Sequence, residues 1–121
     1  MFILVKEVEF SAAHIIPGHP GVCKNLHGHT YKVKVFVQSE RLNHLDMVID
    51  FSELKRIVKE EVKRFDHSYL NELEEFREKT PTAEIIAMFL YENITKRLPV
   101  GLKLQKVEVY ENDSSYAIYY P

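Results

Sequence analysis

Hydrophobic and polar residues alternate with a period of two over four stretches of this chain. The clearest stretch, Gly28–Gln38, alternates apolar residues with lysines and other polar residues. Because successive strand side chains point to opposite faces, this alternation predicts a half-buried strand. The same period, although less regular, predicts strands over residues 2–13, 102–111 and 115–120. The first two strands and the last two strands are therefore expected to form two hairpins.

Apolar residues at helical spacing predict two helices between the hairpins. The first helix begins at Asp50, an N-cap residue with Glu53 three residues later, which is a signature of a helix start. Its apolar stripe consists of Phe51, Leu54, Ile57, Val58, Val62 and Phe65. The second helix is expected to begin with Thr80 as the N-cap and Pro81 as the first helical residue, and Pro99 ends it.

The predicted order of elements is β-β-α-α-β-β, which indicates an α+β fold. Two hairpins on either side of two helices predict one four-stranded antiparallel sheet with both helices on one face. Four strands do not close on themselves, so we expect the edges of the sheet to pair with other subunits. A chain of 121 residues has the length of a single domain, 1–121.

Composition and charge restrict the class of function. The net charge of −2 argues against non-specific binding to nucleic acid, which requires a basic surface. Charges interrupt the apolar N-terminal residues early, so we expect neither a signal peptide nor a membrane span. A single cysteine excludes an internal disulfide and requires no oxidising compartment, so we expect a cytoplasmic protein.

Three histidines fall on positions where strand geometry brings them together. His27 and His29 are two residues apart at the start of a predicted strand, so their imidazoles share a face. His14 ends the preceding strand, and a hairpin would place it beside this pair. Three nitrogen donors with an open fourth position are the arrangement of a catalytic zinc site. The alternative is that each histidine is an ordinary solvated surface residue.

Cys23 is the one cysteine and lies in a loop with two prolines and two glycines, four residues before His27. A free cysteine is often a small buried hydrophobic residue. Beside a metal ion or a cation, however, its pKa falls and the thiolate can act as a base or a nucleophile. It is alternatively a fourth metal ligand, which would make the site structural.

Two acidic positions add to the candidate chemistry. Asp66 directly precedes His67, and a carboxylate can set the tautomer and basicity of an imidazole. The alternative for His67 is a helix C-terminal residue that interacts with the helix dipole. Glu111 shares a face with Val107 and Val109 at the end of a predicted strand. Its carboxylate therefore either extends into solvent, at a frayed strand end, or points at a ligand.

Six motifs occur in the order of one known family. They are F-S-A-A-H ending at His14, C-x3-H-G-H over 23–29, D-F-S-E-L-K over 50–55, F-D-H-S-Y-L-N over 65–71, P-T-A-E over 81–84 and V-Y-E-N over 109–112. Over almost the whole chain, this set closely resembles the 6-pyruvoyltetrahydropterin synthase / 6-carboxytetrahydropterin synthase family. Any one motif is weak evidence, whereas the ordered set is highly specific.

The resemblance implies a T-fold, in which β-β-α-α-β-β units form trimers around a barrel and two trimers stack into a homohexamer. It implies active sites between subunits and three zinc ligands, which are His14, His27 and His29. Cys23 resembles the catalytic base, and His67, paired with Asp66, resembles the proton-relay residue. Glu111 resembles the acid that binds the guanidine-like edge of the pterin and is also counted with the relay. Thr82 matches a position that lines the pterin pocket.

The implied reaction is that of a carbon-oxygen or carbon-carbon lyase on 7,8-dihydroneopterin triphosphate. The short spacing between Cys23 and His27 resembles the 6-carboxy-5,6,7,8-tetrahydropterin synthases of queuosine biosynthesis, which release triphosphate and acetaldehyde. The residues around 98–101 and 109–111 also resemble the 6-pyruvoyl branch, which remains the alternative. A folate branch with Glu in place of the cysteine is disfavoured by Cys23. A non-catalytic module that binds metal or pterin is the competing hypothesis from another class.

Overall fold

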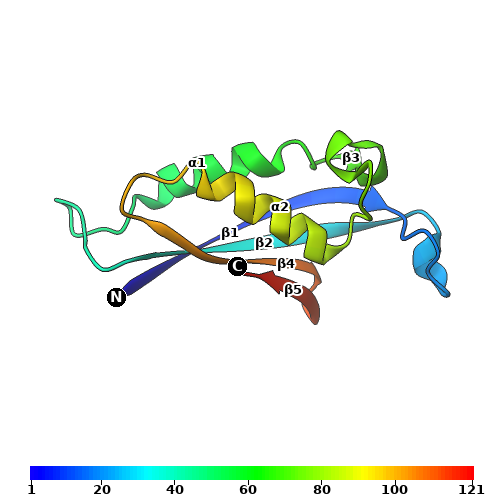
Figure 1. Ribbon diagram of the computed structural model, residues 1–121, viewed down its shortest axis with the longest axis horizontal. Helices are drawn as coiled ribbons and strands as arrows, with labels where there is room; N and C mark the ends of the chain where they lie inside the picture. Colours follow the sequence, from blue (N-terminus) through cyan, green and yellow to red (C-terminus); the bar gives the residue numbers. More distant parts are fainter.

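Two helices cover one face of a β-sheet in the computed structural model, which describes residues 1–121 (Figure 1). Helix α1 spans Phe51–Val62 and helix α2 spans Ala83–Thr95. The prediction that both helices lie on one face of the sheet is therefore confirmed. Neither helix is long and apolar enough to cross a membrane.

The sheet has five strands rather than the four expected from the sequence. The strands are β1 (Phe2–His14), β2 (His27–Ser39), β3 (Ser68–Tyr69), β4 (Lys103–Asn112) and β5 (Ser115–Tyr119). Their order across the sheet is β3-β1-β2-β4-β5, and the four long strands pair antiparallel as predicted. The additional strand, β3, runs parallel to the end of β1. Two residues are too few to show a period of two, so the sequence pattern did not reveal this strand.

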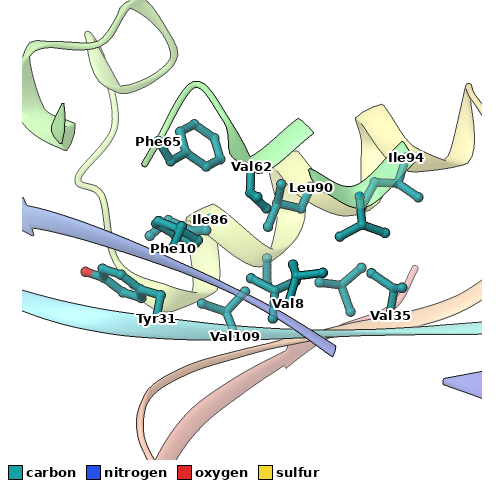
Figure 2. Close-up of a cluster of buried hydrophobic side chains, with 14 of the residues drawn as sticks. Val8, Phe10, Tyr31, Val35, Val62, Phe65, Ile86, Leu90, Ile94 and Val109 are labelled. Atoms are coloured by element: carbon teal, nitrogen blue, oxygen red, sulfur yellow. The ribbon is translucent and has the colours of Figure 1, made fainter. Parts of the chain in front are cut away.

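The register between β1 and β2 builds the core. Val8 lies opposite Val33 and Phe10 lies opposite Tyr31, so these four side chains share the face that the helices cover. The Phe10 and Tyr31 rings stack with their centroids 4.8 Å apart. Figure 2 shows Val8, Phe10 and Tyr31 pointing toward the apolar side chains of the two helices. Burial of each such side chain contributes about 1.5–3 kcal/mol to stability.

The start of α1 agrees with its sequence signature, whereas two residues of its stripe do not lie as expected. The Asp50 side chain accepts a hydrogen bond from the Ser52 N–H at 2.7 Å and caps the helix as predicted. Phe51 is 52% exposed because it occupies the first helical position, outside the buried stripe. Phe65 is buried although the helix ends at Val62, because the following turn directs it back to the core.

Helix α2 begins two residues later than predicted. Its N-cap is Thr82, whose hydroxyl oxygen accepts a hydrogen bond from the Ile85 N–H at 3.2 Å, and not Thr80. Pro81 consequently lies before the helix, and its carbonyl accepts a hydrogen bond from the His14 ring at 2.8 Å. Both threonines are competent caps, and the contact of Pro81 with His14 favours the later start.

The replacement of Thr82 by Ala is expected to lower the free energy of unfolding by about 1 kcal/mol, because it removes the acceptor for the Ile85 N–H. Thr80→Ala is the matched control and should have a markedly smaller effect. Urea unfolding of the two variants measures both values. A larger loss in Thr80→Ala than in Thr82→Ala would contradict this assignment of the helix start.

Candidate metal centre

Three histidines meet at one end of the β1–β2 hairpin. His14 lies directly opposite His27, and His29 lies opposite Ala12, so the three imidazoles share the face covered by the helices. The ring centroid of His14 is 4.5 Å from that of His27 and 5.1 Å from that of His29. One nitrogen from each ring lies within 4.8 Å of the others. The structure thus assembles the donor set that the strand pattern predicts.

Backbone carbonyls set the tautomers of two of these rings. The His14 Nδ1 lies 2.8 Å from the Pro81 carbonyl oxygen, and the His27 Nδ1 lies 2.7 Å from the Asn25 carbonyl oxygen. A carbonyl only accepts, so each Nδ1 carries the proton and each Nε2 keeps its lone pair. Carbonyl partners of this kind are typical of histidines that ligate metals.

The third ring provides a direct test of whether a metal ion fits. The Nε2 of His29 is buried and has no hydrogen-bond partner. Such an orphaned polar atom costs roughly 1–3 kcal/mol, which a bound cation would offset. Together with the Nε2 atoms of His14 and His27, this atom makes a set of three imidazole donors, so the residues fit a transition-metal ion.

Cys23 does not complete a four-ligand set. It lies in a short 3-10 helix, Val22–Lys24, and its side chain is half-buried. Its sulfur is outside the cluster of atoms within 4.8 Å that the three histidines form. The arrangement is therefore three protein donors with an open position, which is the pattern of catalytic rather than structural sites.

Burial favours the neutral form of two candidate ligands, His14 and His29. Desolvation lowers the pKa of His14, the hydrogen bond to Pro81 opposes this shift, and the neighbouring His27 lowers the pKa further. Desolvation also lowers the pKa of His29, and the Glu111 carboxylate opposes that shift. A neutral imidazole is the form that binds a metal ion, so these environments favour metal binding near neutral pH.

Glu111 lies beside the cluster, at an irregularity of β4. The pairing of β4 with β5 shifts by one residue between Tyr110 and Asn112, which leaves Glu111 as the extra residue of a β-bulge. Its Oε2 lies 3.8 Å from the His29 Nε2, and its side chain is 31% exposed. It therefore faces the candidate centre from the rim, partly open to solvent.

A hollow of about 430 Å³ lies next to Glu111, between the start of α2 and β5. Its walls include Glu84, Ser115 and Tyr116. Thr82 does not line this hollow, because its hydroxyl faces the Ile85 N–H as the helix cap. The structure thus places Glu111 in a cavity and leaves Thr82 just outside it.

Asp66 and His67 contact each other and the end of β1. The His67 Nδ1 lies 3.0 Å from the Asp66 Oδ1. The same oxygen accepts the Ser11 N–H at 2.9 Å, and this bond and that of His67 hold the pKa of Asp66 below its ordinary value. The His67 N–H donates to the Ser11 carbonyl at 2.6 Å. His67 adopts a left-handed φ of 56°, an uncommon conformation that the two bonds to Ser11 support.

His67 and Glu111 face separate hollows. His67 lines an open hollow of about 470 Å³ together with Gly28, His29 and Thr30. Glu111 lines the other hollow, so a single chain does not bring these two side chains into one cavity. His67 also lies five residues beyond the end of α1, so the alternative interpretation as a residue on that helix's dipole is wrong.

Sequence reasoning missed two polar residues near the centre. Tyr31 is fully buried, and its hydroxyl lies 3.2 Å from the His14 Nδ1 and 3.3 Å from the His14 Nε2. Burial raises the pKa of this phenol. Its position two residues after His29, on the same strand face, was the available signal. Asn71 makes two hydrogen bonds to the backbone of Ile15. It closes a recognised motif, but no period or pairing in the sequence indicates its partner.

Lowering the pH from about 7.5 to about 5.5 is expected to destabilise the metal-free protein. The pKa values of His14 and His29 are lowered from 6.5 on folding, so below that pH the unfolded chain binds more protons. Their contribution is therefore fully present above pH 6.5 and is lost as the pH falls toward the folded-state pKa values. Urea unfolding at each pH measures the loss. His29→Gln should lose less stability than the wild type, and an equal loss in both would refute the prediction.

Comparison with known proteins places these features in one family. A model of the family described as 6-pyruvoyl tetrahydropterin synthase matches residues 3–121. A putative 6-carboxy-5,6,7,8-tetrahydropterin synthase of Archaeoglobus fulgidus is 43% identical over 108 residues, covering 89% of this chain and 86% of that protein. The 6-carboxy-5,6,7,8-tetrahydropterin synthase of Synechocystis sp. is 39% identical over 125 residues, covering 99% of this chain and 94% of that protein.

A solved structure supports the same assignment. The 6-pyruvoyl tetrahydropterin synthase of Caenorhabditis elegans matches with a TM-score of 0.88 at 26% identity, covering 99% of this chain and 95% of that one. This likeness confirms the expected T-fold of the single chain. The architecture, the histidine cluster and the match over residues 3–121 lead to one conclusion: the chain belongs to the 6-pyruvoyl tetrahydropterin synthase family.

Proposed function

We propose that this protein is a zinc-dependent lyase that converts 7,8-dihydroneopterin triphosphate and one water molecule to 6-carboxy-5,6,7,8-tetrahydropterin, triphosphate and acetaldehyde. The observation that carries the proposal is the open three-histidine cluster, in a chain 39–43% identical to two proteins with the 6-carboxy synthase name. In this role the whole chain, 1–121, acts as one domain in the pathway to queuosine. The need for a reduced Cys23 favours the cytoplasm as its location.

Zinc is the proposed ion, held by the ring nitrogens of His14, His27 and His29. Three imidazole donors with an open position suit zinc, although such sites also accept other transition metals. When bound, zinc would supply Lewis-acid chemistry and hold the hydroxyl groups of the substrate side chain. The carbonyls of Pro81 and Asn25 orient two of the ligands before any ion arrives.

Cys23 and His67 are the proposed proton-transfer residues, and Asp66 supports one of them. The Cys23 thiolate removes the proton from the carbon next to the substrate hydroxyls. The Asp66 carboxylate, 3.0 Å from the His67 Nδ1, keeps a proton on that nitrogen. The exposed Nε2 of His67 is then the atom that gives or takes a proton on the opposite face of the substrate.

Glu111 is the proposed anchor for the pterin ring. Its two carboxylate oxygens can accept from two parallel N–H groups of a guanidine-like edge, a strong and directional pair of hydrogen bonds. The hollow of about 430 Å³ beside it provides a place for a planar ring. Thr82 is kept as a proposed pocket residue, since its neighbours Ala83 and Glu84 form part of that wall.

The sheet edges support the proposal that the protein forms trimers around a barrel, stacked as a homohexamer. On one side, β1 pairs only through Ala12 and Ala13, so most of its length offers unpaired backbone groups. The outer edge of β5 is also unpaired. Exposed apolar side chains, among them Phe2, Ile3 and Ile118, lie on these two strands. Edge-to-edge pairing would satisfy both edges and bring His67 of one copy toward Glu111 of another.

The 6-pyruvoyl product is the second candidate. The likeness to the C. elegans 6-pyruvoyl tetrahydropterin synthase favours it, because that protein covers 99% of this chain. Both candidates share the residues and the proton transfers described above, and they differ in whether the substrate side chain is finally cleaved. A non-catalytic module that binds metal or pterin is the remaining alternative.

Zinc is expected to stabilise the protein, by about 2.7 kcal/mol when the free ion is at 100 times its dissociation constant. His29→Ala should weaken zinc binding by more than about 100-fold, because it removes a ligand rather than an outer hydrogen-bond partner. Competition with a chelator measures the affinity. His44→Ala is the matched control, since this exposed histidine lies outside the cluster and should bind zinc like the wild type. Unchanged affinity in His29→Ala would contradict the site.

Mass spectrometry of the zinc-loaded protein with 7,8-dihydroneopterin triphosphate tests the reaction. The expected products are 6-carboxytetrahydropterin, triphosphate and acetaldehyde. Cys23→Ala should keep its zinc and lose turnover by about 10²–10⁴-fold, the usual contribution of a general base. A pyruvoyl product would move the protein to the second candidate, and zinc binding without any product would favour the non-catalytic module.

A further inference from the structure

The side-chain amide of Asn71 pairs with both polar groups of the Ile15 backbone. The Ile15 N–H donates to the Asn71 Oδ1 at 2.9 Å, and the Asn71 Nδ2 donates to the Ile15 carbonyl at 3.1 Å. One amide thus uses its donor and its acceptor on a single residue, as a neighbouring strand would. These bonds span 56 positions in the sequence, so they join two distant segments.

This pairing extends the sheet beyond the end of β3. The parallel ladder pairs Ala12 with Ser68 and Ala13 with Tyr69. The chain then turns into a 3-10 helix at Leu70–Glu72, and its backbone leaves the direction of the ladder. The Asn71 side chain continues the pairing along β1 where its backbone does not. Its contact falls on the residue that directly follows the metal-ligand candidate His14.

The contact reaches the loop that carries Cys23. Next to Ile15, the Ile16 N–H donates to the Cys23 carbonyl at 2.8 Å. The other backbone N–H bonds of this loop, donated by His19, Lys24 and Asn25, are all accepted within it. Ile15 and Ile16 are therefore the link through which the first half of the loop is held to the rest of the protein.

The same segment also carries the Asp66–His67 pair. The Asp66–His67 pair hydrogen-bonds to the N–H and the carbonyl of Ser11, and Asn71 hydrogen-bonds to the N–H and the carbonyl of Ile15. These two pairs of hydrogen bonds lie on either side of His14. Residues 66–71 thus fix the position of His67, the end of β1 and the start of the Cys23 loop relative to one another.

We propose that Asn71 is a positioning residue that holds the Cys23 loop in place beside the three histidines. Its importance for catalysis rests on the proposed role of Cys23 as the base. Loss of the Asn71 amide frees the Ile15 and Ile16 backbone and lets Cys23 move away from its position, whether or not Cys23 is the base.

Asn43 provides a matched control. Its side-chain oxygen accepts hydrogen bonds from the Leu45 and Met47 N–H groups at 2.9 and 3.1 Å. This asparagine therefore also organises a loop through backbone bonds. Its loop lies at the opposite end of the long axis of the molecule from the Cys23 loop (Figure 1). Replacement of either asparagine removes hydrogen bonds of a loop, whereas only replacement of Asn71 is expected to affect Cys23.

Hydrogen exchange and alkylation of the zinc-loaded protein test the proposal. In Asn71→Ala, the Ile15 and Ile16 amides should exchange about 10-fold faster, the factor expected for one typical hydrogen bond. Iodoacetamide should modify Cys23 several-fold faster, and kcat should fall with little change in KM or zinc content. Asn43→Ala should match the wild type in all of these. Exchange and alkylation at wild-type rates in Asn71→Ala would overturn the proposal.

Asn71→Asp covers the case in which the alanine variant does not fold. Aspartate keeps an acceptor for the Ile15 N–H but places a carboxylate against the Ile15 carbonyl. The Ile15 amide should stay protected while Cys23 still reacts faster, and an unchanged Cys23 rate would overturn the proposal. These measurements need no turnover. If Cys23→Ala is fully active, the proposed function fails while the exchange result for Asn71 still stands.

Discussion

The antiparallel register of β1 against β2 is the constraint on which both the core and the candidate centre depend. It sets Phe10 opposite Tyr31 in the core and His14 opposite His27 at the end of the same hairpin. A slip of one residue would turn one strand's apolar residues toward solvent, so core burial holds this register strongly. The geometry of the three histidines is thus maintained by apolar contacts that extend along the sheet, and not by the histidines themselves.

The three histidines make the metal-free state less stable than it would otherwise be. Burial lowers the pKa values of His14 and His29, and the His29 Nε2 has no partner. Carbonyls of Pro81 and Asn25 satisfy only the Nδ1 atoms of the other two rings. The fold therefore prepares lone pairs for an ion at the expense of its own stability, which is a common property of sites that are organised before they bind.

Residues 66–71 connect the parts of the site that come from different elements. They hydrogen-bond to Ser11 of β1 and to Ile15, the residue after β1, and they place the Asp66–His67 pair beside the hairpin. Glu111 approaches the histidines from the other side, on a bulge of β4. The separation of His67 from Glu111, together with the free edges of β1 and β5, supports the proposal that the site is completed between copies of the chain.

The sequence by itself determined the long strands, the two helices and the shared face of the three histidines, because these depend on periods that repeat over many residues. It did not determine β3, which has two residues and therefore no period. It also placed the cap of α2 at Thr80 instead of Thr82, because either threonine can cap and a contact between Pro81 and His14 decides. The partners of Asn71 and of the histidine Nδ1 atoms were likewise decided by tertiary structure, since they are single contacts between segments that no local pattern relates.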